Sequence, residues 1–268
     1  MQTAWIACGI LLAAPVLGAG VIRLETAVLT HADPHETAVF VVLRNAGDEP
    51  AHRIAIEGRL AGHVVTRPPF DLEPGGSADD ELILPFDAPE TGTRVAELRL
   101  RYRDRNGYPF SAVTVGRVAF GGEARPSPVF ARLQSATIRE AGRLEVRLRL
   151  PDGETPRPVR LRYLVPDDLE CEAPDRTVTL FPGRLTVAAA ALSNRTGRAG
   201  SVYPVFAIIR EEGPEGVREQ AVRGAVTLAD AGAGRVPWIG LGAGGAALLV
   251  ALFILRQAGG RAGGSNGV

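Results

Sequence analysis

The chain has 268 residues, with 30 basic and 30 acidic side chains and a formal net charge of zero at pH 7. Every basic residue is Arg, and the balanced charge lacks the excess of positive residues that marks a nucleic-acid-binding protein. Cysteine occurs only at Cys8 and Cys171, which excludes a scaffold held together by disulfides.

The N-terminal segment, residues 1–22, contains no charged side chain. Its apolar stretch Ala4–Ala14 has the length of a signal-peptide core, and the run Leu17-Gly18-Ala19 offers small residues for cleavage. We therefore predict a signal peptide over residues 1–20. The basic residues that usually open such a segment are missing, so an N-terminal anchor that stays in place is the alternative.

The body of the chain, residues 21–234, has the pattern of β-strands separated by turns. In the runs 98–103, 144–150 and 160–165, Leu, Val and Tyr alternate with charged residues, so one face meets a core and the other meets water. Between two strand-like segments, Asn106-Gly107 predicts a β-hairpin, because both residues tolerate the positive φ of a primed turn. About seven short strands per hundred residues, without a long helical period, predict an all-β fold of the Ig-like β-sandwich type.

A single offset of 108 residues relates five landmarks in the two halves of the body. The related segments are 21–29 and 129–137, 54–56 and 162–164, 71–75 and 179–183, Gly92 and Gly200, and 95–102 and 203–210. A shared offset at five places predicts two tandem Ig-like β-sandwich domains, at residues 21–122 and 127–229.

The first copy contains four motifs of turns and strands. They are Val39-Phe40-Val41-Val42-Leu43-Arg44-Asn45-Ala46-Gly47, Leu72-Glu73-Pro74-Gly75-Gly76, Gly92 ahead of the strand Leu98–Tyr102, and Asp104 to Gly107. Together they resemble the CARDB and NEW3 group of bacterial and archaeal Ig-like modules. The resemblance implies an adhesive, spacer or interaction role on an exported protein, without shared catalytic residues. The second copy resembles the group only loosely, because it carries the acidic segment Pro166–Pro174 and lacks an Asn-Gly turn.

Two segments contain residues that could bind a metal ion. His31-Ala32-Asp33-Pro34-His35 offers zinc ligands, but Pro34 makes the backbone irregular and the other histidines, His52 and His63, are distant in sequence. Asp167–Asp175 has five carboxylates in nine residues but lacks the spacing of an EF-hand calcium loop. We expect solvated side chains in both segments. Zinc at the first, and calcium or a partner at the second, are the alternatives.

Cys171 and three rows of Arg are the remaining candidates for chemistry. Cys171 lies among carboxylates, which raise the pKa of a thiol, and the second copy has no His to activate it, so we expect an inert thiol. The Arg rows that share a strand face are Arg99, Arg101 and Arg103; Arg147 and Arg149; and Arg160 and Arg162. We expect them on a polar outer sheet face, paired weakly with residues such as Glu97 and Glu145; an anionic glycan is the alternative partner.

The C-terminal segment Val236–Leu255 is a second uncharged stretch, and its 20 residues match the length of a transmembrane helix. Arg256 and Arg261 follow it without an acidic residue. Residues 256–268 are therefore predicted as a short cytoplasmic tail, which places the body in the periplasm or outside the cell.

Taken together, these features predict a single-pass protein of the cytoplasmic membrane without enzymatic activity or cofactor. Its two domains would bind a protein or glycan partner, or act as a spacer. Gly240 and Gly244 are the predicted helix-packing residues, because small residues four apart let helices approach closely. They support the alternative function of an accessory subunit in a multispanning transporter or secretion complex. A hydrolase or metal enzyme has the least support, since the sequence has no recognisable nucleophile–base pair or phosphate loop.

Overall fold

The computed structural model describes residues 21–32, 36–85, 91–120, 126–213 and 216–229. These residues form seventeen β-strands and no helix, so the predicted all-β fold is confirmed. All of them belong to one compact unit that ends at Ala229. None of the described residues lies in a helix long and apolar enough to cross a membrane. The predicted signal peptide and the segment Val236–Leu255, with Gly240 and Gly244, lie outside the described residues.

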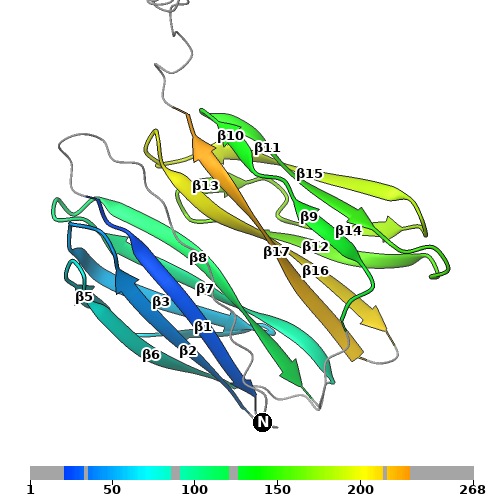
Figure 1. Cartoon of the computed structure of the whole chain (residues 1–268), viewed down its shortest axis with the longest axis horizontal. Coiled ribbons are helices and arrows are strands. Elements are labelled where there is room, and N and C mark those ends of the chain that lie inside the picture. Colours follow the sequence, from blue (N-terminus) through cyan, green and yellow to red (C-terminus); the bar gives the residue numbers. More distant parts are fainter. Residues whose placement is uncertain (1–20, 33–35, 86–90, 121–125, 214–215, 230–268) are drawn as a thin grey trace, which may run out of the picture. The chain divides into compact units, whose positions relative to one another are not determined.

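A first hydrophobic core lies between two sheets in the N-terminal half of the body (Figure 1). One sheet has the strand order β1-β2-β6, and the other joins β3, β4, β5, β7 and β8. The strands are β1 (Leu24–Ala32), β2 (Glu36–Asn45), β3 (Ala51–Leu60), β4 (His63–Thr66), β5 (Phe70–Leu72), β6 (Ser77–Pro85), β7 (Gly92–Arg103) and β8 (Pro109–Phe120). Val39, Val41 and Leu43 of β2 face the same core as Leu98 and Leu100 of β7, so alternate side chains of each sheet fill the space between them.

A second hydrophobic core lies between the sheet β13-β15-β11-β9 and a sheet in which β14, β12, β16 and β17 are neighbours. The strands are β9 (Phe130–Leu133), β10 (Ala136–Ile138), β11 (Ala141–Arg149), β12 (Arg157–Leu164), β13 (Leu169–Cys171), β14 (Asp175–Leu180), β15 (Leu185–Asn194), β16 (Val202–Gly213) and β17 (Gly216–Leu228). The neighbours β1-β2-β6 and β3-β7-β8 of the first half recur here as β9-β11-β15 and β12-β16-β17. Each half is therefore sandwich-like, with the same order of strands around its own core.

The predicted offset of 108 residues holds at the turns but not on every strand. Gly75 and Gly183 both follow a proline and have positive φ, 74° and 68°. Ile54, however, is buried in the first core, whereas its predicted counterpart Arg162 does not face the second core. A β-bulge shifts the register of β3 next to Ile54, where Arg53 has a φ of 53°. Because side chains alternate along a strand, one extra residue exchanges the two faces, and a single offset fails.

β7 and β8 form the hairpin that Asn106-Gly107 predicts, but the predicted primed turn is wrong. Arg103 pairs with Pro109 at the end of the ladder. Gly107 has a φ of 77°, whereas Asn106 is absent from the described residues with positive φ. Asp104 stabilises the loop instead, because its Oδ1 accepts a hydrogen bond from the N–H of Asn106 at 2.9 Å.

Asn45 connects two of the sequence motifs that resemble the Ig-like modules. It is fully buried, and its Nδ2 donates to the backbone oxygens of Glu49 at 2.8 Å and Leu72 at 3.2 Å. Its Oδ1 accepts from the N–H of Gly47 at 3.1 Å, and its own N–H donates to the carbonyl of Gly76 at 2.9 Å. The turn after β2 and the Pro-Gly turn before β6 are thus held together by one residue.

Replacing Asn45 with Ala should lower the free energy of unfolding by about 2–4 kcal/mol, because several buried backbone groups lose their partner. Urea unfolding measures this loss. Asn194→Ala is the matched control, since Asn194 is half-buried and exchanges two hydrogen bonds with the backbone of Gly197. Its cost should be about 1 kcal/mol. Equal losses in the two variants would contradict the role of Asn45.

Candidate functional site

A third hydrophobic cluster joins the two halves of the body. It contains Val95 and Val113 from the first half and Leu164, Phe206 and Ile208 from the second. These residues lie on the faces of β7, β8, β12 and β16 that point away from the first and second cores. Both faces of these strands are covered, so polar side chains between the halves have to find partners there.

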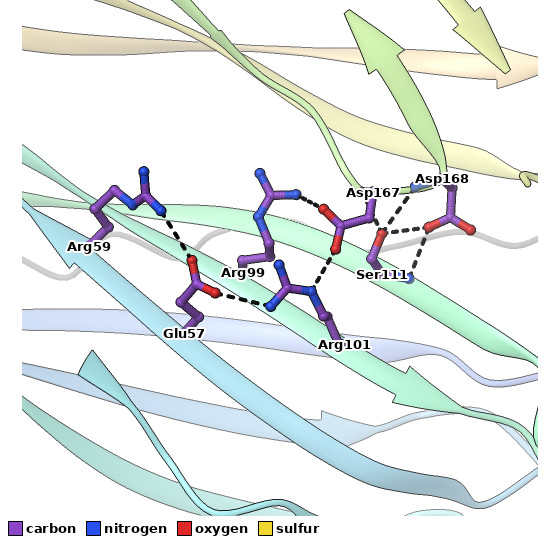
Figure 2. A network of polar contacts seen from close by, with 7 residues as sticks. All are labelled: Glu57, Arg59, Arg99, Arg101, Ser111, Asp167 and Asp168. Atoms are coloured by element: carbon purple, nitrogen blue, oxygen red, sulfur yellow. Dashed lines mark hydrogen bonds and ion pairs between the residues drawn. The ribbon is translucent and has the colours of Figure 1, made fainter. Parts of the chain in front are cut away.

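Polar side chains also connect the two halves (Figure 2). We name this group the polar seam: Glu57, Arg59, Glu97, Arg99, Arg101, Ser111, Arg162, Asp167 and Asp168. Asp167 accepts from Arg99 and, at 2.6 Å, from the Nε of Arg101. Arg101 also donates at 3.0 Å to Glu57, which Arg59 approaches to 3.4 Å. One carboxylate of the second half thus holds two Arg of β7.

Asp168 attaches the loop between β12 and β13 to β8. Its carboxylate accepts hydrogen bonds from the N–H of Ser111 at 2.9 Å and from the Ser111 hydroxyl. The N–H of Asp167 in turn donates to the Oγ of Ser111 at 2.7 Å. Asp168 is only 3% exposed, and burial raises the pKa of its carboxyl, although the hydrogen bonds from Ser111 act in the opposite direction.

Two more carboxylates, whose side chains are each only 10% exposed, accept from Arg across the same contact. Glu97 of β7 pairs with Arg162 of β12, and burial raises the pKa of Glu97 although Arg162 favours its charged form. Glu219 of β17 pairs with Arg94 of β7 at 3.2 Å and also accepts from the N–H of Val95 at 2.9 Å. Each half therefore supplies a carboxylate to an Arg of the other.

The backbones of the two halves also meet. β17 pairs with β7 in parallel at Val217–Gly92 and Arg218–Thr93, which makes β14-β12-β16-β17-β7-β3-β4 one continuous path of hydrogen-bonded strands. Gly92 and Gly216 have φ values of 129° and 103°, and a Cβ on either would overlap with a backbone oxygen of the opposite segment. Glycine is required at this crossing for both reasons.

Cavities of about 420, 330 and 450 Å³ lie along the polar seam. The residues that line them include the paired groups Arg59, Glu97, Arg99, Arg101, Arg162, Asp167, Asp168, Arg210 and Glu219. An anion that binds one of these paired guanidinium groups would have to displace the carboxylate that already holds it. The arrangement therefore suits a structural joint between the halves better than a binding pocket.

Cys171, the last residue of β13, lines the cavity of about 420 Å³. Burial, and to a smaller extent Glu172, raise the pKa of its thiol to about 11. The sequence predicts a raised pKa from the neighbouring carboxylates, and burial is the larger cause. At neutral pH the thiol is protonated and a poor nucleophile. Within the described residues, no three His, Cys, Asp or Glu side chains are grouped so as to hold a metal ion.

Two predictions from the sequence are wrong. Arg99, Arg101 and Arg162 do not lie on an outer sheet face, because they pair with carboxylates of the opposite half; Arg162 pairs there with its predicted partner Glu97. Asp168 is not a solvated loop residue, because it is buried, and Asp167 binds two Arg although its side chain is 41% exposed. Alternation along a strand shows which side chains share a face, but it does not show that a second sheet covers that face.

Other predicted residues lie where the sequence placed them. Arg103, Arg147, Arg149 and Arg160 are exposed and make no contact with the opposite half in the ion pairs of the described residues; Arg160 lies 3.5 Å from Asp175.

Of the candidate zinc ligands, His31 is exposed and residues 33–35 lie outside the described residues. His52 binds Asp71 at 3.1 Å, and Asp71 also accepts from the N–H of Arg53 at 2.7 Å. The hydrogen bond from the N–H of Arg53 is the main cause that lowers the pKa of Asp71, and the bond with His52 is the next. The Asp71 carboxylate thus binds the backbone at the bulge of β3.

Arg94, Ser111 and Glu219 were missed from the sequence. A signal for part of this contact exists, because the run Val202–Ile209 of β16 is uninterrupted by charged residues. Such a run is typical of a strand that is buried on both faces. It indicates where a second sheet packs, but not which polar residues pair there.

No protein family profile matches the chain, and no curated protein matches it. A protein of unknown function from Porphyromonas gingivalis W83 is similar in structure over 76% of this chain and 99% of its own, with 14% identity and a TM-score of 0.30. Red sea bream transglutaminase covers 76% of this chain, with 12% identity and a TM-score of 0.28, and this chain spans 31% of it. The collagen adhesin of S. aureus covers 78% of this chain and 93% of its own, with 10% identity and a TM-score of 0.26. Similarity this remote identifies no family.

Double-mutant cycles should rank the ion pairs of the polar seam by burial. We expect a coupling energy of about 1.5–3 kcal/mol for Glu97–Arg162, whose carboxylate is 10% exposed. For Arg101–Asp167, where both side chains are close to half exposed, we expect about 0.5–1 kcal/mol. Urea unfolding of the single and double Ala variants measures both. The exposed pair Arg149–Asp152, 3.9 Å apart, is the control and should couple by less than about 0.5 kcal/mol. Equal coupling in all three pairs would contradict the ranking.

Asp168 should make stability depend on pH. Because its pKa is raised in the folded chain, its contribution to stability falls as the pH rises from the ordinary carboxyl pKa, about 4, through the raised value. Asp168→Asn keeps an oxygen for Ser111 but does not titrate. The free energy of unfolding of the wild type minus that of Asp168→Asn should therefore decrease across this range in urea unfolding at several pH values. Glu73→Gln, in an exposed turn, is the control. A difference that rises with pH would show that we have assigned the wrong sign.

Proposed function

We propose that this protein is a non-enzymatic, membrane-anchored protein that presents two tandem Ig-like domains, residues 21–122 and 127–229, outside the cytoplasmic membrane. Its activity is interaction with a protein or glycan, or the spacing of a partner from the membrane. The segment Val236–Leu255 serves as the anchor in this proposal, with residues 1–20 as the signal peptide.

The observation that carries the proposal is the pairing within the polar seam. Glu97, Asp167 and Asp168 each bind a partner from the opposite half, next to the hydrophobic cluster around Val95 and Phe206. Groups that in an enzyme would converge on a substrate here converge on one another. This supports a rigid pair of domains whose outer surfaces interact with partners, and it gives no support to a hydrolase.

The strand order adds support for the Ig-like assignment. In each half, a sheet that contains three neighbouring strands packs against a second sheet that contains three more. Alternate side chains of these strands form the core between the two sheets. Ig-like sandwiches share this two-sheet arrangement. Their surfaces and strand edges are common docking sites for proteins.

Cell fractionation tests the anchor. We expect the full-length chain in the membrane fraction, resistant to high salt and released by detergent, and a chain that ends at Gly234 in the soluble extracytoplasmic fraction. The truncation leaves the compact unit up to Ala229 intact, so circular dichroism of the released body should show β-structure. Full-length protein that remains soluble without detergent would overturn the proposal.

A pull-down with the same two chains separates the proposed function from its alternative. Capture of the same partner by both chains supports interaction through the domains. A multispanning membrane protein that is captured only by the full-length chain would support an accessory subunit that docks through Gly240 and Gly244. The full-length Asp48→Asn variant, which removes one exposed charge from the body, is the control and should capture the same proteins as the full-length wild type.

A further inference from the structure

The outer face of the sheet β1-β2-β6 combines exposed apolar side chains with acids. Phe40, Val42 and Ile83 are 40%, 40% and 42% exposed. The register places Leu29, Phe40 and Glu81 in one row across the three strands, and Ala27, Val42 and Asp79 in the next. We name this surface the acidic face: Ala27, Leu29, Phe40, Val42, Asp79, Glu81 and Ile83.

The outer face of the sheet β13-β15-β11-β9 has the same design with the opposite charge. Phe130, Leu185 and Val187 are 70%, 55% and 50% exposed. The register places Phe130, Arg149 and Leu185 in one row, and Arg132, Arg147 and Val187 in the next. We name this surface the arginine face: Phe130, Arg132, Arg147, Arg149, Leu185 and Val187.

These two faces hold six of the eight large hydrophobic side chains that are exposed within the described residues. Single exposed apolar residues are common on protein surfaces, but clusters of them mark interaction sites. Each cluster here has charges of one sign within its two rows, three Arg on one face and two acids on the other. The two faces are therefore complementary in charge and alike in apolar content.

We propose that the acidic face of one copy of this chain docks on the arginine face of a second copy. The apolar side chains of the two faces cover each other, and Asp79 and Glu81 meet the guanidinium groups of Arg132, Arg147 and Arg149. The guanidinium is suited to this contact because its planar fork binds a carboxylate with two hydrogen bonds and is weakly hydrated. The contact is heterologous, so it either closes into a ring or continues as a chain of copies.

β17 shows where the arginine face lies within the body. Gln220, near the start of β17, donates to the carbonyl of Val129 at 2.8 Å, next to Phe130. β17 leaves the body at its other end, where Leu228 pairs with Ile138. Eight strand residues separate these ends, or roughly 26 Å. The arginine face thus lies away from the point at which the chain continues toward Val236–Leu255.

Charge reversal tests this docking. The full-length chain, kept in solution with a mild non-ionic detergent, should associate in sedimentation experiments as its concentration rises, and more weakly at high salt. Asp79→Arg with Glu81→Arg, or Arg147→Glu with Arg149→Glu, should each raise the dissociation constant about tenfold or more. A chain with all four substitutions has the charges of the two faces exchanged and should associate again. An equimolar mixture of the two double variants should also associate, because both faces of one variant are then positive and both faces of the other are negative.

The controls keep the outcome decisive. Glu73→Arg with Arg139→Glu reverses one acid and one Arg at exposed residues outside both faces and should leave association unchanged. Circular dichroism and thermal unfolding show whether each variant is folded. A wild type that stays monomeric would overturn the proposal, as would association that ignores the reversals, which would indicate contacts outside the two faces. Binding of monomers to anionic vesicles that is lost with Arg147→Glu would identify a lipid surface as the occupant instead.

Discussion

The structure depends on the burial of both faces of β7 and β16. One face of each strand completes the core of its own half, and the other packs against the opposite half through Val95, Phe206 and Ile208. Because Arg94 and Glu97 are buried at this second contact, they need partners there, and both partners come from the other half. Sliding one half by a residue would separate buried charges, at a cost of several kcal/mol each, so the ion pairs fix how the halves match.

The pairing also explains why guanidinium groups suit this contact. Arg offers five donors in a fixed plane, so a single carboxylate such as Asp167 can hold Arg99 and Arg101 while Arg101 still reaches Glu57. An ammonium group donates from a single nitrogen, so it lacks the two separate nitrogens with which Arg101 contacts Asp167 and Glu57. At this joint, hydrophobic side chains of the two halves pack together, and a chain of hydrogen bonds fixes how the halves are oriented.

The sequence allowed the all-β class, the strands and the hairpin positions to be predicted, because alternation and turn residues are local. Val39, Val41 and Leu43 reached the core as their spacing indicates. The same reasoning failed for Arg99 and Asp168, because alternation identifies a face without identifying what covers it. The fixed offset failed at Ile54 for a related reason, since one bulged residue exchanges the faces of a strand. Contacts between distant strands are decided by packing, which no short stretch of sequence contains.

Charge is distributed in two different ways in this chain of zero net charge. In the polar seam, opposite charges are paired, so little field extends beyond it. Within the rows of the acidic face and the arginine face they are segregated, with Asp79 and Glu81 on one half and Arg147 and Arg149 on the other. Segregation without net charge favours attraction between copies over repulsion. A rigid joint strengthens such an attraction, because two faces held in one geometry lose less orientational freedom on docking than two domains on a flexible linker.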